Sequence, residues 1–123
     1  MRRSILKSKI HGVYVNKSNL EYEGSCTIPR RYLEIADIRP FEKVHILNVS
    51  NGQRLETYAI VGEDDSSFEI NGAAAHLVHA GEKILILTYA GVNDEDLPNF
   101  ESLLIFLEDQ NRKYRVVKQR PVL

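Results

Sequence analysis

The sequence predicts a mainly β domain with two short helices, and three observations carry that prediction. Two β-rich runs, residues 44–49 and 54–60, flank an Asn51-Gly52 pair. Because Asn-Gly readily takes the positive φ angles of a type I′ turn, we expect a hairpin there. A nearly continuous apolar run, residues 83–89, is typical of a strand buried on both faces. Shorter strand-like runs cover residues 12–16, 67–70, 103–107 and 115–118. Many short strands in one small chain favour a β-barrel or a closed β-sandwich.

The two helices fit between these strands. The first begins near Pro29, a residue favoured in the first helical turn, with Thr27 as a candidate N-cap, and it extends to Ala36. The second covers residues 72–78, is rich in alanine and is followed by a glycine that can end it. Residues 93–98 are acidic and rich in turn formers, so we expect a surface loop there.

Length and composition indicate one globular domain, residues 1–123, with 43% hydrophobic and 27% charged residues. Sixteen Lys and Arg against 17 Asp and Glu give a net charge of −1, whereas a dedicated nucleic-acid binder is usually strongly basic. The single cysteine, Cys26, excludes an intrachain disulfide, and no apolar run has the roughly 20 residues of a membrane span. We therefore expect a cytoplasmic protein with no nucleic-acid or membrane partner. Because no metal-ligand residues cluster, we expect no metal site.

The dipeptide Gly24-Ser25 is the first candidate for chemistry. A glycine can adopt backbone conformations closed to other residues, which would bring the following serine hydroxyl near the preceding carbonyl. That geometry would permit an N→O acyl shift, after which the ester can eliminate to dehydroalanine and hydrolyse to a pyruvoyl group. Most Gly-Ser pairs are ordinary turns, so the dipeptide alone does not decide.

Five short motifs in a fixed order give the dipeptide more weight. They are Lys9-Ile10-His11, Tyr22-Glu23-Gly24-Ser25-Cys26, Asn51-Gly52-Gln53-Arg54, Thr57-Tyr58-Ala59-Ile60 and Asn71-Gly72-Ala73-Ala74-Ala75-His76. Together they closely resemble the bacterial pyruvoyl-dependent aspartate 1-decarboxylases, from about residue 4 to about residue 89. One departure is Leu47, which stands where some members have a tryptophan, and the region after residue 90 matches only loosely.

The resemblance implies a six-stranded double-psi β-barrel with short helices, assembled as a homotetramer with active sites between subunits. It implies self-cleavage between Gly24 and Ser25 into a β chain of residues 1–24 and an α chain of residues 25–123. The pyruvoyl cofactor would form from Ser25. The implied reaction converts L-aspartate to β-alanine and CO₂ through a Schiff base, for pantothenate and coenzyme A synthesis.

The resemblance also assigns roles to charged and hydroxyl side chains. Arg54 would clamp a substrate carboxylate and Lys9 would supply a second positive charge, although single surface cations are usually just solvated. Tyr58 would donate the proton that replaces CO₂, although a half-buried hairpin tyrosine is an equally natural interpretation. The Thr57 hydroxyl would polarise the Gly24 carbonyl during cleavage. Neighbours on a regular strand point to opposite faces, so the roles of Thr57 and Tyr58 require a twist or bulge, or distinct subunits.

Asn71 is the candidate hydrogen-bond partner of the substrate or of the developing pyruvoyl, and it would also serve as an ordinary helix cap. The next three residues are assigned to substrate binding, and the free amides of the last two suit an anion: Gly72, Ala73 and Ala74. Tyr22 and His11 are assigned to shaping the pocket. The remaining histidines and Cys26 are interpreted as structural.

Two other functions remain open from the sequence. The chain could be an uncleaved, catalytically silent β-barrel that binds a small acid or a partner protein. It could also be a pyruvoyl enzyme for another amino acid, such as glutamate. A pocket of fixed depth between Lys9 and Arg54 should resist one extra methylene by about 1–3 kcal/mol.

Overall fold

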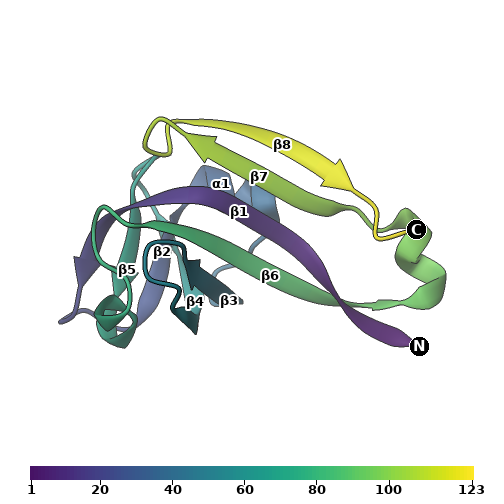
Figure 1. The fold of residues 1–123 in the computed structure, drawn as a ribbon, viewed down its shortest axis with the longest axis horizontal. Helices are drawn as coiled ribbons and strands as arrows, with labels where there is room; N and C mark the ends of the chain where they lie inside the picture. Colours follow the sequence, from purple (N-terminus) through teal and green to yellow (C-terminus); the bar gives the residue numbers. More distant parts are fainter.

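The computed structural model describes residues 1–123, and its strands form one sheet that closes on itself (Figure 1). The strands are β1 (Arg2–Asn19), β2 (Ser25–Pro29), β3 (Lys43–Asn48), β4 (Arg54–Gly62), β5 (Phe68–Asn71), β6 (Lys83–Asn93), β7 (Ser102–Glu108) and β8 (Lys113–Gln119). The helical elements are α1 (Arg30–Ala36) and two 3₁₀ helices, η1 (Gly72–His76) and η2 (Asp94–Asn99). None of them is long and apolar enough to cross a bilayer.

Six of the strands make a closed barrel. They follow one another in the order β5-β2-β4-β3-β6-β1, and β5 pairs again with β1 to close the ring. The β2–β4 and β1–β5 pairs are parallel, and the other barrel pairs are antiparallel. A β7–β8 hairpin extends the sheet from β1 and lies along it at the top of Figure 1. The predicted mainly β, six-stranded barrel with short helices is confirmed.

Strand β1 is much longer than the run at residues 12–16 that the sequence indicated. Its first part pairs with β6 and its last part with β5, and three register shifts let it bend between these partners. Gly12, at φ 77°, lies within one of these shifts, where a Cβ would come within 3.2 Å of the Leu107 carbonyl oxygen. Bulges of this kind turn a strand around a barrel corner.

The core is built from side chains that alternate along each strand. In β6 the residues Ile84, Ile86 and Thr88 are buried, whereas Leu85 and Leu87 remain partly exposed. The prediction that this run is buried on both faces is therefore wrong for the single chain, because one face points into the barrel and the other points outward. The fully buried large side chains are Tyr32, Phe68, Ile10, Ile28, Ile46, Ile70, Ile84, Ile86, Ile105, Val13, Val15 and Val44.

The β3–β4 hairpin exists, but its turn differs from the predicted type I′. Five residues connect the strands, and Gly52 has φ 77° while Asn51 is not at positive φ. Type I′ needs positive φ at both central residues. Instead, Asn51 accepts a hydrogen bond from the Gln53 amide at 2.9 Å through its own side chain and donates to the Leu77 carbonyl at 3.0 Å.

Three local predictions need correction around the helices. Thr27 is not a helix cap: it lies inside β2, a strand that the sequence reading missed, and α1 begins after Pro29 without a side-chain cap. The predicted second helix is a short 3₁₀ helix, η1, rather than a helix over residues 72–78. Residues 94–99 form the 3₁₀ helix η2 instead of a loop, with three acidic residues in its first turn.

Candidate active site

Ser25 is the first residue of β2 and is 2% exposed. The antiparallel β2–β5 pairing places it directly opposite Asn71, the last residue of β5. The Asn71 Nδ2 donates to Ser25 Oγ at 3.0 Å and to Thr27 Oγ1 at 3.0 Å. The Ser25 hydroxyl donates in turn to the Glu23 carbonyl at 3.4 Å. The structure therefore holds the serine oxygen between an amide donor and the chain that precedes it.

The close backbone approach at this site centres on Gly72. Its φ is 69°, and a Cβ there would lie 2.5 Å from the Gly24 Cα and 2.9 Å from the Tyr22 carbonyl oxygen. Gly24 itself is not at positive φ, and a Cβ on it would meet only the Asn71 carbonyl oxygen, at 3.9 Å. The expectation that Gly24 supplies an unusual φ is wrong, because the steric requirement for glycine lies at position 72.

A cavity of about 270 Å³ lies next to the Gly24–Ser25 bond. Three segments that are distant in sequence line it: the loop before β2, strand β4 and helix η1. The lining residues are Gly24, Leu55, Glu56, Thr57, Ala73, Ala74 and Leu77. Four of these were predicted site residues, so the structure brings Gly24, Thr57 and the start of η1 together. The Glu56 carboxyl has a lowered pKa, mainly because Lys43 hydrogen-bonds it at 3.0 Å.

The other eight predicted site residues do not line this cavity: Lys9, His11, Tyr22, Ser25, Arg54, Tyr58, Asn71 and Gly72. Tyr58 is half-buried against Phe41, with ring centroids 6.1 Å apart. His11 lies against Phe106 at 5.3 Å, and its pKa is lowered by burial and by the neighbouring charges of Lys9 and Lys83. Arg54 is exposed at the beginning of β4, and Tyr22 is exposed in the loop before β2.

The sheet register explains this separation. Residues 54–58 of β4 pair with β3 without a register shift, so no bulge turns the strand over. Thr57 pairs with buried Val44 and faces inward, and its neighbours Arg54, Glu56 and Tyr58 belong to the other face. Lys9 pairs with Leu87, which pairs with His45, which pairs with Glu56. Cross-strand partners share a face, so Lys9 lies on the same outer face as Arg54 and Tyr58.

Sequence reasoning missed Thr27 as a site residue. Its hydroxyl shares the Asn71 amide with Ser25, as described above. The signal was present in the sequence, since residues two apart on a strand face the same side. Cys26, between them, points the other way and is fully buried; burial raises the pKa of its thiol to about 12. The predicted structural role of Cys26 is consistent with that burial.

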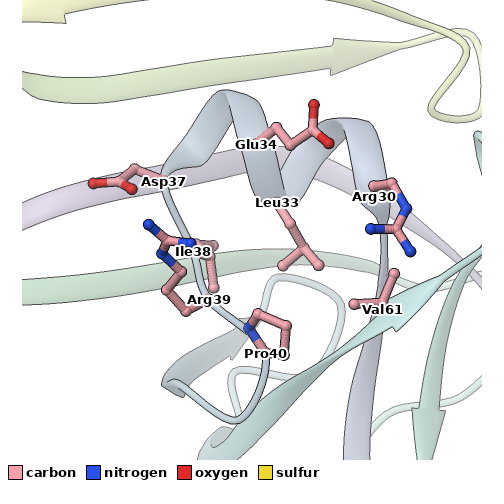
Figure 2. Close-up of a pocket in the computed structure, with 8 residues that line it drawn as sticks. All are labelled: Arg30, Leu33, Glu34, Asp37, Ile38, Arg39, Pro40 and Val61. Carbon is pink, nitrogen blue, oxygen red and sulfur yellow. The ribbon is translucent and has the colours of Figure 1, made fainter.

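A second cavity of about 470 Å³ lies beside α1, away from Ser25 (Figure 2). Figure 2 shows Leu33 projecting from α1 between Arg30 and Arg39. The charges that line this cavity are balanced, with two arginines and two acidic residues. Arg30 already forms an ion pair with Glu63 at 3.0 Å. The lining holds no serine, threonine, cysteine or lysine and none of the predicted site residues, so the candidate chemistry belongs to the cavity at Gly24.

Fold and site define a small β-barrel enzyme with a buried, hydrogen-bonded serine after a glycine. The chain belongs to the aspartate decarboxylase family, whose model matches residues 1–114. It is 47% identical over 113 residues to the aspartate 1-decarboxylase of Thermoanaerobacter pseudethanolicus. The matched region covers 91% of this chain and 97% of that protein. The enzyme of the same name from Ralstonia nicotianae is 42% identical, over 91% of this chain and 94% of that protein. Membership of this family makes the chain an enzyme of the decarboxylase class.

Proposed function

We propose that the chain cleaves its own Gly24–Ser25 bond and uses the resulting pyruvoyl group to convert L-aspartate to β-alanine and CO₂. The product would serve pantothenate and coenzyme A synthesis in the cytoplasm. The observation that carries the proposal is the buried Ser25 Oγ, held by Asn71 at 3.0 Å immediately after the glycine that lines the cavity.

The cleavage chemistry follows from the groups around Ser25. Its Oγ attacks the Gly24 carbonyl carbon, the C–N bond breaks, and the proton of the hydroxyl ends on the released amine, leaving an ester. Elimination then removes the Cα proton of residue 25 to solvent and breaks the Cβ–Oγ bond, which gives a Gly24 carboxylate and a dehydroalanine. Water hydrolyses the latter and releases ammonia, which leaves the pyruvoyl. The Thr57 hydroxyl, which shares the cavity with Gly24, is suited to polarise the attacked carbonyl.

The residues around position 25 fit a pyruvoyl group. The Asn71 amide is the nearest donor to residue 25, and η1 begins with Gly72, Ala73 and Ala74 beside the cavity. When formed, the group supplies a carbonyl electrophile for the substrate amine and an acceptor for the electron pair left by CO₂. Because the group would form from residue 25 of the chain itself, where Ser25 is buried, it needs no separate binding pocket.

We further propose that a neighbouring subunit completes the site, in a homotetramer. The support is the outer-face location of the residues assigned to substrate: Lys9, Arg54 and Tyr58. That face also carries apolar side chains that one chain leaves partly exposed, among them Leu85 and Leu87. A second subunit packed on the face would bury them and bring the cations toward another chain's cavity. Arg54 and Lys9 would then bind the two carboxylates of aspartate.

Intact-protein mass spectrometry tests the proposal. We expect two fragments that meet between residues 24 and 25, with the larger one blocked to Edman degradation, and a single full-length mass for Ser25→Ala. Both proteins should have the same circular dichroism spectrum. A wild-type protein that stays full length after prolonged incubation and releases no CO₂ would favour the silent binding barrel. Comparing aspartate with glutamate turnover tests the substrate, and light scattering tests the tetramer.

A further inference from the structure

The Asn71 side chain that hydrogen-bonds Ser25 also hydrogen-bonds a third residue, Thr27. The amide nitrogen carries two hydrogens, and the structure uses both: Nδ2 lies 3.0 Å from Ser25 Oγ and 3.0 Å from Thr27 Oγ1. Ser25, Thr27 and Asn71 are all buried, so solvent offers no easy replacement for either partner.

We propose that Thr27 is a positioning residue for self-cleavage, acting through Asn71. This inference rests on the proposed function. By accepting one amide hydrogen, the Thr27 hydroxyl fixes the orientation of the Asn71 amide, with its nitrogen toward β2. The second hydrogen is then directed at Ser25 Oγ.

The orientation of the amide matters for the chemistry of the serine. Negative charge grows on Ser25 Oγ as it gives up its proton and attacks the Gly24 carbonyl carbon. A donor aimed at that oxygen favours the charged form. A flipped amide would present its carbonyl oxygen instead, which would accept a hydrogen bond from the serine and hold the proton in place.

The Thr27 side chain is itself fixed by packing against β4. A Cβ on Gly62 would lie 2.8 Å from the Thr27 Cγ2, so the threonine methyl occupies the space that glycine leaves open. Parallel pairing of β2 with β4 brings this stretch of the two strands together. With the methyl held there, Oγ1 is directed toward Asn71.

The chain offers a matched control for a threonine-to-valine change. Thr88 on β6 is 1% exposed, and its hydroxyl is hydrogen-bonded to Ser8 Oγ at 2.5 Å, away from the Gly24 cavity. Thr27→Val and Thr88→Val each remove one buried hydroxyl and keep the shape of the side chain. Both should lower the melting temperature, so stability alone does not separate them.

The test measures the rate at which the full-length chain is converted to two fragments. We expect Thr27→Val to cleave roughly tenfold more slowly, the effect of losing one ordinary hydrogen bond, while Thr88→Val cleaves at the wild-type rate. Thr27→Ser, which keeps the hydroxyl, should restore the rate. In an Asn71→Ala background, Thr27→Val should have no further effect.

Three results would overturn the inference: wild-type cleavage by Thr27→Val, equal slowing by Thr88→Val, or additive slowing in the Asn71→Ala background. If Thr27→Val fails to fold, Thr27→Ala removes the hydroxyl instead. It should cleave roughly tenfold more slowly than Thr27→Ser, and equal rates for these two variants would overturn the inference. A wild-type protein that does not cleave at all would instead refute the proposed function, so the two failures are distinguishable.

Discussion

Replacing Gly72 by alanine should disturb the site more than replacing any other glycine of the chain by alanine. The new Cβ would lie 2.5 Å from the Gly24 Cα and 2.6 Å from the Gly24 nitrogen. Both are backbone atoms, so no flexible side chain can move aside. The chain before Ser25 must shift, and with it the carbonyl that the serine attacks. Gly72→Ala should therefore slow cleavage as well as lower stability.

The magnitude follows from two contributions. Position 72 has φ 69°, and a residue with a Cβ in the left-handed region costs about 1–2 kcal/mol. Overpacking against fixed neighbours typically costs about 1–3 kcal/mol more. The sum, about 2–5 kcal/mol, is a large part of the roughly 5–15 kcal/mol that stabilises a typical domain. Gly81→Ala is the matched control, because Gly81 has φ 89° and no atom within 4 Å of a new Cβ.

Stability is best measured by urea unfolding of both alanine variants in a Ser25→Ala background, which keeps the chains intact. The difference between Gly72→Ala and Gly81→Ala then isolates the steric contribution, expected at about 1–3 kcal/mol. Cleavage is measured separately with Ser25 present. If Gly72→Ala unfolds at the same urea concentration as Gly81→Ala and cleaves normally, the close approach of Gly72 to Gly24 is not rigid and the reasoning fails.

Three further predictions concern the two faces of the barrel and one histidine. Thr57→Val should slow cleavage, followed on a gel, about 10²–10³-fold, which is the usual cost of losing one oxyanion donor. Tyr58→Phe should mature normally and release CO₂ slowly. If Tyr58→Phe slows cleavage and Thr57→Val slows only CO₂ release, the two roles are exchanged. Arg54→Ala should mature normally but lose several kcal/mol, about 2–5, in kcat/KM for aspartate, and unchanged turnover would make Arg54 a mere surface residue. The His11 pKa is lowered from 6.5 by burial first, so its NMR titration midpoint should lie below 6.5. As far as His11 is concerned, the folded protein is then most stable above pH 6.5, and its free energy of unfolding decreases as the pH falls toward the folded-state pKa. A midpoint above 6.5 would contradict this.

The fold could be predicted from the sequence where the pattern is local. Two β-rich runs with turn residues between them located the β3–β4 hairpin, and a nearly continuous apolar run located β6. The sequence pattern did not predict the full length of β1, because its bends depend on partners far along the chain. It also did not predict β2, whose first residue, Ser25, was interpreted as a reactive residue. The predicted turn type was also wrong, because the Gln53 amide donates to the Asn51 side chain and not, as in a two-residue turn, to the backbone. Pairing with distant strands decided the first two cases, and a local side-chain hydrogen bond decided the third.

The site was predictable only as a set of residues. The motifs named Gly24, Thr57, Ala73 and Ala74, and the structure gathers them around one cavity. They did not indicate that the strict need for glycine lies at Gly72, since that need arises from two segments that meet only in the folded barrel. Spacing along a strand could have identified Thr27, because it faces the same side as Ser25.

The two faces of β4 suggest why maturation and turnover would use different residues of one strand. Inward-facing Thr57 shares a cavity with Gly24 within a single chain, so two groups of the proposed cleavage already lie together in this chain. Tyr58 and Arg54, on the outer face of β4, do not line that cavity, although Glu56 on the same face does. We therefore expect turnover to depend on a second chain and cleavage to proceed without one. It follows that substitutions on the outer face that keep subunits apart should abolish aspartate turnover and leave the cleaved Gly24–Ser25 bond as evidence that the inner face still works.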